Sequence, residues 1–388
     1  MDWIIWMMAI IGHIGIWCVV FNQVHATAWP RPTRKSSEKF ILFAVAAPLL
    51  VVAIFAIARQ TIGFAEILTV SLFYWYAMIC VVLACFFVLQ WVYRKWATQL
   101  PAAVVSTKTE WLNLKKECAQ PLLHGTATKA LGKIPFNEIL KLTRQRMTFA
   151  LDIPKELDGL KICQLSDLHL TGQLGIEYFQ RIVDEANLFE PDITIITGDL
   201  VDELECLDWL PETVGRLKAK LGVYYVLGNH DRRIKDETDY RTRLKSIGLT
   251  QAAGQWIRLE FNGATIELTG NAMPWYWDAK QLSDDADGKG KSGLRMLLSH
   301  SPDQVDWARG RDFDLMFAGH THGGQIALPV IGALVAPSKY GVFYASGTFQ
   351  VDKMLMHVSR GISGDDPVRI CSPPELGLFT LKSQAPIS

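Results

Sequence analysis

Hydrophobic residues in this chain are concentrated in three long stretches near the N-terminus. These stretches run from Trp3 to Phe21, from Phe40 to Ala58 and from about Ile67 to Tyr93, and none of them contains Lys, Arg, Asp or Glu. A helix needs about 20 apolar residues to cross the hydrocarbon core of a bilayer. The pattern therefore predicts three transmembrane helices.

The charged residues beside these stretches predict their orientation. Basic residues gather in the first loop and directly after the third stretch: Arg31, Arg34, Lys35, Lys39, Arg94 and Lys95. Because cytoplasmic loops of membrane proteins carry an excess of Lys and Arg, we expect the first loop and the chain after residue 95 to be cytoplasmic. For His13, inside the first stretch, we favour helix packing over contact with a proton or substrate.

Beyond residue 95 the pattern changes, and we divide the rest into a juxtamembrane connector (96–143) and a soluble domain (144–388). The connector has mixed polarity and one helix-like piece around Glu110 to Glu117. In the soluble domain, short apolar runs end in polar clusters and alternate with helix-like stretches at 175–189 and 206–220. This alternation is typical of an α/β fold, in which strand ends deliver the reactive side chains.

The second half of the soluble domain contains strand-like segments without long helices between them. These segments are 256–259, 264–269, 294–299 and 314–317, and they predict a second sheet. We therefore expect a layered β core with helices outside it. The segment 284–293, which is rich in Asp, Gly and Lys, is the most loop-like part of the chain.

Composition excludes several classes of protein. The 388 residues carry 39 basic and 39 acidic side chains, but residues 1–95 hold only ten of these charges, which excludes a single water-soluble globule. With 49% apolar residues the chain is not disordered. Its neutral balance gives no electrostatic case for nucleic-acid binding. The seven cysteines form no CxxC pair and predict reduced thiols rather than a disulfide framework.

Seven side chains with metal-binding chemistry follow the apolar runs of the soluble domain: Asp167, His169, Asp199, Asn229, His300, His320 and His322. Each type alone is commonly a cap, a turn residue or a surface residue, but their combination at strand ends indicates a shared site. Oxygen and nitrogen ligands without a thiolate suit Mn²⁺, Fe or Zn²⁺. Seven ligands exceed the needs of one tetrahedral ion and suit two divalent ions about 3.5–4 Å apart.

The motifs that contain these residues resemble the five blocks of the calcineurin-like metallophosphoesterase family. They are DLH at 167–169, GDLVD at 198–202, GNHD at 228–231, SH at 299–300 and GHTHGGQ at 319–325. The resemblance covers roughly residues 145–385 and implies a four-layer α/β/β/α sandwich. It implies that the two ions share Asp199 as a bridge, one being completed by Asp167, His169 and His322 and the other by Asn229, His300 and His320.

The same resemblance implies a mechanism. A hydroxide that bridges the two ions would attack the phosphorus in line, and His230, which is not a ligand, would lie beside the substrate phosphate and assist the leaving group. Asp231 would orient His230; a structural role for Asp231 in the loop is an equally open alternative.

A second resemblance concerns the C-terminal motifs at 358–361, 367–370 and 373–376. They are similar to those of a membrane-associated bacterial branch of the family, which includes transmembrane proteins with a metallophosphoesterase domain and enzymes that cleave UDP-2,3-diacylglucosamine in lipid A synthesis. The resemblance implies a multi-pass enzyme of the bacterial inner membrane that hydrolyses a phosphodiester or pyrophosphate bond in a lipid-linked substrate.

Two other functions stay open at this point. One is a phosphatase or phosphodiesterase that acts on nucleotides or phosphoproteins, and the other is a non-catalytic membrane scaffold or sensor. The aromatic run from Trp275 to Trp277 offers a surface for an acyl chain or a nucleobase, although we favour a packing role for it.

Overall fold

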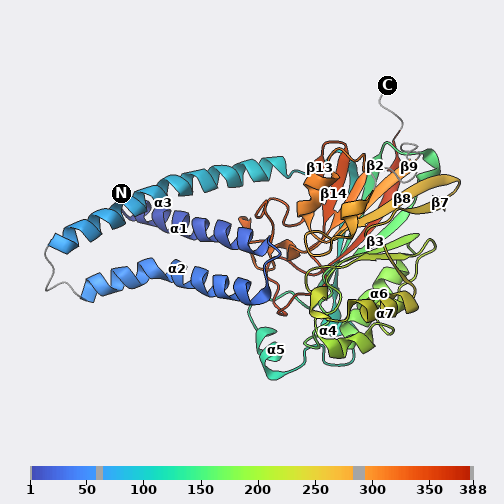
Figure 1. The fold of residues 1–388 in the computed structure, drawn as a ribbon, viewed down its shortest axis with the longest axis horizontal. Coiled ribbons are helices and arrows are strands. Elements are labelled where there is room, and N and C mark those ends of the chain that lie inside the picture. The colour runs from blue at the N-terminus through green and yellow to red at the C-terminus, as the bar shows by residue number, and fades with distance from the viewer. Residues whose placement is uncertain (1, 58–63, 283–292, 385–388) are drawn as a thin grey trace. The chain divides into compact units, whose positions relative to one another are not determined.

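The computed structural model describes residues 2–57, 64–282 and 293–384. The chain forms two compact units, and each is described separately. The helical unit comprises Met1–Gln99 and Lys339–Phe343, and the αβ unit comprises Leu100–Ser338 and Tyr344–Ser388. In Figure 1 the helices of the first unit are coloured from blue to cyan.

Three long helices build the helical unit: α1 (Asp2–His25), α2 (Arg31–Ile57) and α3 (Phe64–Ala97). Two segments, Ile4–His25 in α1 and Phe73–Ala97 in α3, are long and apolar enough to cross a membrane. The expected span 40–58 falls in α2, and its last residue lies outside the described residues. The structure thus supports two of the three expected spans as membrane-spanning candidates.

The helices of this unit approach one another closely. A side chain at Gly12 of α1 would overlap the backbone of Cys80 in α3, so glycine permits the contact. His13 lies next to this contact, with its Nδ1 2.6 Å from the Tyr76 hydroxyl and its Nε2 3.2 Å from the Val45 carbonyl oxygen. His13 therefore joins α1 to both other helices, which is the packing role that we favoured.

The larger sheet of the αβ unit has seven strands in the order β1-β2-β15-β3-β4-β5-β6. Strands β3 to β6 run parallel to one another, whereas β15 is antiparallel to β3. The sheet is therefore mixed. The strand bounds are β1 Val104–Asn113, β2 Lys141–Leu151, β3 Lys161–Leu165, β4 Ile193–Thr197, β5 Val223–Val226, β6 Leu249–Gln251 and β15 Glu375–Ser383.

The second sheet has six strands in the order β13-β14-β10-β9-β8-β7, and it is also mixed, because β7 and β13 are antiparallel to their neighbours. Its strands are β7 Ile257–Phe261, β8 Ala264–Asn271, β9 Gly293–Ser299, β10 Leu315–Ala318, β13 Gly347–Val351 and β14 Met354–Val358. A separate two-stranded hairpin consists of β11 (Ala327–Leu328) and β12 (Gly332–Ala333).

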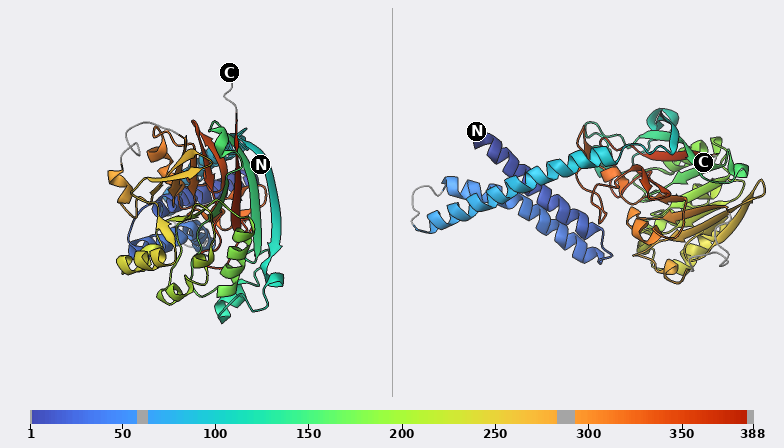
Figure 2. Two further views of the ribbon diagram at one scale, coloured as in Figure 1. Left: turned by 90° about the vertical axis from the view of Figure 1, so that its right-hand side faces the viewer. Right: turned by 90° about the horizontal axis from the view of Figure 1, so that it is seen from above.

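Side chains from the two sheets meet in the core of the αβ unit. Figure 2 shows the ribbon from two further directions. The rings of Phe317 in β10 and Phe379 in β15 lie 5.2 Å apart. Polar contacts also cross the interface, since the Gln164 side chain in β3 donates a hydrogen bond to the carbonyl oxygen of Ala318 in β10, with a nitrogen–oxygen distance of 3.0 Å. The unit is thus an α/β sandwich of two facing mixed sheets.

Helices and short 3₁₀ turns occupy the connections between strands. The principal helix, α6, follows β3 and agrees with the expected stretch 175–189. The helical elements are α4 Leu114–Glu117, α5 Thr126–Leu131, α6 Ile176–Leu188, α7 Glu237–Ser246, α8 Val305–Ala308, η1 Lys155–Leu157, η2 Leu204–Trp209, η3 Val214–Arg216, η4 Asp231–Arg233, η5 Asp278–Gln281, η6 Pro302–Gln304 and η7 His322–Gly324.

Two expectations for local structure were wrong. The helix expected at 206–220 is broken into η2 and η3, because Pro211 has no amide hydrogen to donate and restricts the residue before it. The piece expected to be helical at 110–117 is strand β1 as far as Asn113, and only its second half, α4 (Leu114–Glu117), is helical. Strand β1 pairs with β2 at the edge of the first sheet. Much of the expected connector therefore belongs to the αβ unit. The loop expected at 284–293 lies outside the described residues apart from Gly293.

A buried ion pair between the sheets generates a stability prediction. His357 Nε2 lies 2.9 Å from one oxygen of Glu375, and Arg360 lies 3.0 Å from the other. Burial raises the pKa of Glu375, but Arg360 and His357 lower it to about 2. Replacing Glu375 by Ala leaves Arg360 without its carboxylate partner, and we expect the free energy of unfolding to fall by about 3 kcal/mol, the low end of the range for broken buried pairs.

Urea unfolding of the full chain in detergent measures this loss. Glu375→Gln is the matched control, because it keeps the shape and an acceptor oxygen and should cost less. Equal stability of the Ala variant and the unmodified protein would show that the pair contributes nothing.

Candidate metal centre

Five strand ends meet at one edge of the αβ unit. Three belong to the first sheet and two to the second, and parallel neighbours place their carboxyl ends at the same edge. In the first sheet, β3 is followed by Asp167 and His169, β4 by Asp199 and β5 by Asn229. In the second sheet, β9 is followed by His300 and β10 by His320 and His322. The structure brings together all seven residues that the sequence predicted.

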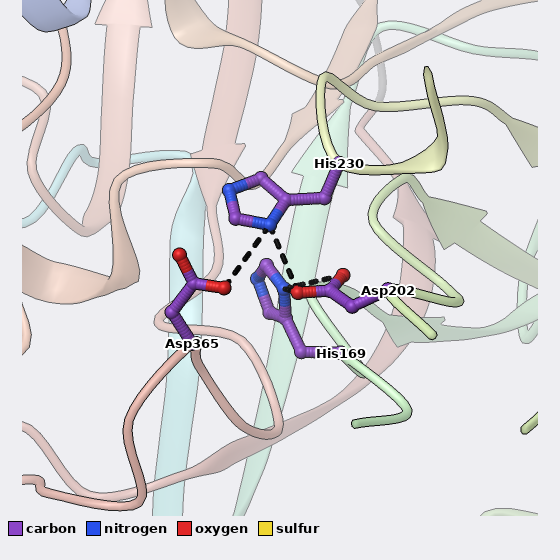
Figure 3. Close-up of side chains that lie close together, drawn as sticks. All are labelled: His169, Asp202, His230 and Asp365. Atoms are coloured by element: carbon purple, nitrogen blue, oxygen red, sulfur yellow. Dashed lines mark hydrogen bonds and ion pairs between the residues drawn. The ribbon is translucent and has the colours of Figure 1, made fainter. Parts of the chain in front are cut away.

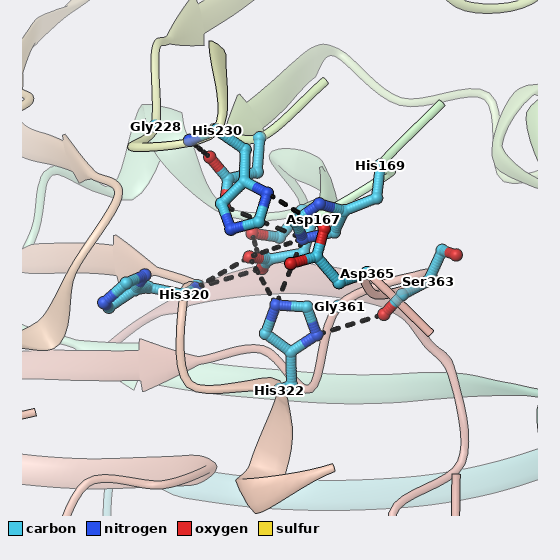
Figure 4. A network of polar contacts seen from close by, with 12 residues as sticks. Asp167, His169, Gly228, His230, His320, His322, Gly361, Ser363 and Asp365 are labelled. Carbon is cyan, nitrogen blue, oxygen red and sulfur yellow. Dashed lines mark hydrogen bonds and ion pairs between the residues drawn. The ribbon is translucent and has the colours of Figure 1, made fainter. Parts of the chain in front are cut away.

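The first group of side chains contains Asp167, His169 and His322, and Figure 4 shows it within its network of polar contacts. The Nε2 atom of His322 lies 3.3 Å from Asp167 Oδ1. The Nε2 atoms of His169 and His322 are 3.2 Å apart. Two imidazole nitrogens and a carboxylate oxygen thus point at a common position.

The second group contains Asp199, His300 and His320, with Asn229 beside them. His300 Nε2 lies 3.2 Å from Asp199 Oδ2 and 3.0 Å from the amide oxygen of Asn229. The same Asp199 oxygen lies 3.7 Å from Nε2 of His169 in the first group. Asp199 therefore lies beside both groups and is the candidate for a carboxylate shared between them.

Hydrogen bonds fix the direction of three imidazole rings. The Nδ1 atoms of His169, His300 and His322 face Asp202 Oδ1 at 3.1 Å, the carbonyl oxygen of Thr197 at 2.8 Å and that of Ser363 at 3.1 Å. An imidazole that donates from Nδ1 keeps its lone pair on Nε2. In its neutral form each ring therefore presents its Nε2 lone pair to a cation, an arrangement common around metal-binding histidines.

The separations fit divalent cations. Nitrogen and oxygen ligands held at about 2.0–2.2 Å from one ion lie within about 4.4 Å of one another, and the measured contacts in each group satisfy that limit. His320 Nε2 is buried and has no hydrogen-bond partner among the described residues. Because an unsatisfied buried polar atom costs about 1–3 kcal/mol, a cation at this position would remove a penalty.

The residues that bring these side chains together have an unfavourable, left-handed backbone conformation. Five of the seven residues have positive φ angles: Asp167 (52°), His169 (46°), Asp199 (53°), His320 (72°) and His322 (53°). Left-handed backbone is costly for residues other than glycine and is concentrated at functional sites. At Gly228 any side chain would overlap Asp199 Oδ1, so only glycine allows the loops to approach this closely.

Burial and charge set the protonation of the centre. Burial raises the pKa of Asp199, but His300 and His230 lower it well below its usual range, so the carboxylate is ionised. Burial lowers the pKa of His320 well below that of a free imidazole, so this ring is neutral. An ionised carboxylate and a neutral imidazole are the forms that bind metal.

Comparison with known proteins identifies the family. The calcineurin-like phosphoesterase family matches residues 160–324, a range that contains all seven residues. An uncharacterized metallophosphoesterase of Bacillus subtilis, YkuE, is 30% identical over 243 residues, which cover 60% of this chain and 82% of the relative. The chain belongs to the calcineurin-like phosphoesterase family.

Two further relatives of this metallophosphoesterase have informative names. The transmembrane protein with metallophosphoesterase domain of Danio rerio is 28% identical over 247 residues, which cover 59% of this chain and about half (55%) of that protein. The UDP-2,3-diacylglucosamine pyrophosphatase LpxG of Chlamydia trachomatis is 26% identical over 300 residues, which cover 62% of this chain and 89% of LpxG. The chain is a metal-dependent phosphoester hydrolase of a family that uses two divalent ions.

The structure places Asp231 differently from our expectation that it orients His230. Its oxygens accept hydrogen bonds from the amides of Asp199 and Gly228 at 3.0 and 2.7 Å and from the Tyr240 hydroxyl at 2.8 Å. Asp231 thus ties the β4 and β5 loops of the metallophosphoesterase together, which is the structural alternative. His230 Nδ1 faces Asp202 Oδ2 at 3.0 Å and Asp365 Oδ1 at 3.4 Å instead (Figure 3).

Asp202, Arg233 and Asp365 were missed in the sequence. Asp202 contacts both His169 and His230, and Arg233 donates to Asp202 at 2.7 Å and to Asp365 at 2.9 Å. Asp202 was visible in the GDLVD motif, but Asp365 is 132 residues from Arg233 and carries no local signal. His169, Asp202, His230 and Asp365 also lie as close together as metal ligands do, but Arg233 already supplies the positive charge there.

These carboxylates act on His230. Burial lowers its pKa, but Asp199, Asp202 and Asp365 raise it to about 10. With Nδ1 engaged by Asp202, the Nε2 atom has no hydrogen-bond partner among the described side chains.

Two more residues support the centre. Arg369 is fully buried and donates to the carbonyl oxygen of His322 at 3.0 Å, and its other terminal nitrogen lies 3.2 Å from His322 Nδ1. The ring of Trp275 lies 4.7 Å from His320. Trp275 and Tyr276 are buried, which agrees with the favoured packing role, whereas Trp277 is 62% exposed.

The shared position of Asp199 predicts a loss of metal. We expect Asp199→Ala, purified as the full chain in detergent, to bind fewer than two ions, because both groups lose a ligand. Metal analysis by mass spectrometry measures this, with His230→Ala as a control that keeps both ions. An unchanged two-ion content in Asp199→Ala would contradict the bridging position.

The contacts of Asp202 predict a weaker effect of the same kind. Asp202→Ala removes the oxygen that holds His169, and we expect metal affinity to fall by about 10–100-fold, as for other residues that orient metal-binding histidines. Competition with a fluorescent chelator measures the affinity. Asp208→Ala is the matched control, because the Asp208 side chain is 86% exposed. Equal affinity of both variants would remove Asp202 from the centre.

Proposed function

We propose that the chain is a membrane-bound phosphoesterase that hydrolyses a phosphodiester or pyrophosphate bond in a lipid-linked substrate, with UDP-2,3-diacylglucosamine as the specific candidate. The observation that carries the hydrolytic part is the convergence of seven ligand side chains and His230 at the ends of five strands. The lipid-linked part is supported by the apolar helices and by the similarity to LpxG.

The site residues take two roles in this proposal. Asp167, His169, Asp199 and His322 hold one divalent ion, and Asp199, Asn229, His300 and His320 hold the other. Bound divalent ions lower the pKa of water and offset the charge of phosphoryl oxygens. The ion identity stays open among Mn²⁺, Fe and Zn²⁺, because nitrogen and oxygen ligands accept all of them.

His230 supplies the proton chemistry in this proposal. Asp202 accepts from Nδ1 and stabilises the protonated ring, so that Nε2 carries the proton that the leaving oxygen needs. A positioned acid of this kind contributes about 10²–10⁴-fold to the rate. His230 is therefore the catalytic residue, and Asp202, Arg233 and Asp365 position it.

The membrane part of the proposal has three crossing helices. In this proposal α2 crosses the membrane together with α1 and α3, and the basic residues at 31–39 and 94–95 support a cytoplasmic αβ unit. An anchor raises the local concentration of a substrate only when that substrate is in the same membrane. We accordingly assign the chain to the bacterial inner membrane as a multi-pass protein.

A direct assay tests the substrate. We expect the detergent-solubilised protein with Mn²⁺ to release UMP from UDP-2,3-diacylglucosamine, and a chelator or His230→Ala to abolish the release. Product analysis by mass spectrometry measures it. Cleavage of an aryl phosphodiester without any release of UMP would exclude the specific substrate and leave the hydrolytic chemistry.

The orientation predicts the accessibility of Cys371, which is exposed in the αβ unit. In right-side-out membrane vesicles an impermeant maleimide should leave Cys371 unlabelled, and in inside-out vesicles it should label it. Cys371→Ser is the control that identifies the labelled site. The reverse pattern would place the αβ unit outside the cytoplasm.

A further inference from the structure

The hairpin formed by β11 and β12 exposes an unusual amount of apolar surface. No Asp, Glu, Lys or Arg occurs between residues 323 and 338. The tip, Pro329–Val330–Ile331, lies between the two short strands. The exposed apolar residues of the hairpin and its flanks are Ile326 (50%), Leu328 (42%), Val330 (79%), Ile331 (42%) and Leu334 (40%). A contiguous exposed apolar segment of this kind marks an interaction site.

Val330 at the tip has a backbone conformation that valine rarely adopts. Its φ angle is 68°, which is a clear outlier for a β-branched residue and is easily adopted by glycine. The chain nevertheless carries a valine there, with its side chain 79% exposed. The backbone preference of valine does not explain this residue, and neither does packing in the core, so its role is in an external contact.

The base of the hairpin is attached to the metal centre. The turn η7, which begins at the ligand His322, leads directly into β11. A side chain on Gly324 would lie 2.8 Å from the carbonyl oxygen of Val335, so the end of the hairpin packs on the turn itself. The Ala327 amide donates to Ile370 at 2.8 Å and holds the first strand.

The segment that follows the hairpin belongs to the helical unit. Lys339–Phe343 is grouped with α1 and α3 rather than with the αβ unit. The Gln23 side chain donates to the carbonyl oxygen of Lys339 at 2.9 Å, and the rings of Tyr93 and Phe343 lie 6.5 Å apart. Aromatic residues at the ends of membrane helices favour the interface of the bilayer. Lys339 follows His322 by only 17 positions.

We propose that the tip of this hairpin inserts into the bilayer interface and presents the metal centre to lipid-linked esters. The occupant of the apolar tip is the membrane itself, because the hairpin is continuous with a segment that packs on the candidate membrane helices. The inference rests on the membrane anchoring in the proposed function, but it concerns a second contact with the bilayer and requires no particular substrate.

Photolabelling tests this contact. The full chain is reconstituted in vesicles that contain a phospholipid with a diazirine in its acyl chain, and labelled peptides are identified by mass spectrometry after illumination. We expect labels in the peptide that contains residues 326–338, with the helices as an internal positive control. We expect Val330→Asp to reduce labelling of this peptide by about tenfold, because it removes an apolar side chain from the interface.

Two matched variants separate the contact from the fold. Val330→Gly relieves the backbone strain, so it should lower labelling while leaving thermal stability equal or higher. Leu188→Asp changes another exposed leucine (70%) at the end of α6, where the chain enters β4 at the opposite edge from the ligands, and it should leave labelling unchanged. Labelled helices with an unlabelled hairpin would overturn the proposal.

Hydrolysis rates and the molecular mass of the solubilised protein distinguish a membrane contact from a contact between two copies of the chain. Val330→Asp should hydrolyse a water-soluble aryl phosphodiester at the normal rate and cleave the same diester on a vesicle-bound lipid about tenfold more slowly. If mass measurement finds a dimer of the unmodified chain that Val330→Asp dissociates while lipid labelling is unchanged, the occupant is a second copy of the chain and the membrane contact is refuted. If UDP-2,3-diacylglucosamine is not cleaved, the proposed substrate fails while the labelling result stands.

Discussion

The arrangement of the candidate centre follows from ionised carboxylates that are buried and therefore need positive charge beside them. Asp167 and Asp199 are almost completely buried, and the Asp199 pKa is held well below its ordinary value. Isolated buried carboxylates are very costly, so such groups are paired or bind metals. Imidazoles converge on them from both sheets, and the positive φ angles at the strand ends follow from bringing these side chains together.

The residues around the centre are consequences of the same constraint. Asp202, Thr197 and Ser363 turn three imidazoles so that each presents Nε2, and Arg369 fixes the turn that carries His322. The Asp231 oxygens accept hydrogen bonds from the amides of Asp199 and Gly228, and these bonds hold the β4 and β5 loops together. His230 contacts Asp202 instead, so the Asp202 carboxylate holds both the candidate ligand His169 and His230. The candidate ligands and His230 thus share a single framework of hydrogen bonds.

The sequence predicted what depends on local pattern and motif. Apolar runs that end in Asp, Asn or His identified β3, β4, β5, β9 and β10 and the seven candidate ligands that the structure brings together, because a strand end and its first polar residue are adjacent in the chain. It could not predict that Asp365 reaches His230, since that contact depends on how the C-terminal loop folds back. The prediction of one helix at 206–220 was wrong because it relied on the spacing of apolar residues and gave too little weight to Pro211.

The central claim is that two cations share Asp199 between the two groups of ligands. Anomalous diffraction from crystals of the Mn²⁺-loaded protein tests it most directly. The account predicts two peaks about 3.5–4 Å apart, each within about 2.2 Å of an Asp199 oxygen. A single peak, or two peaks that share no ligand, would contradict it.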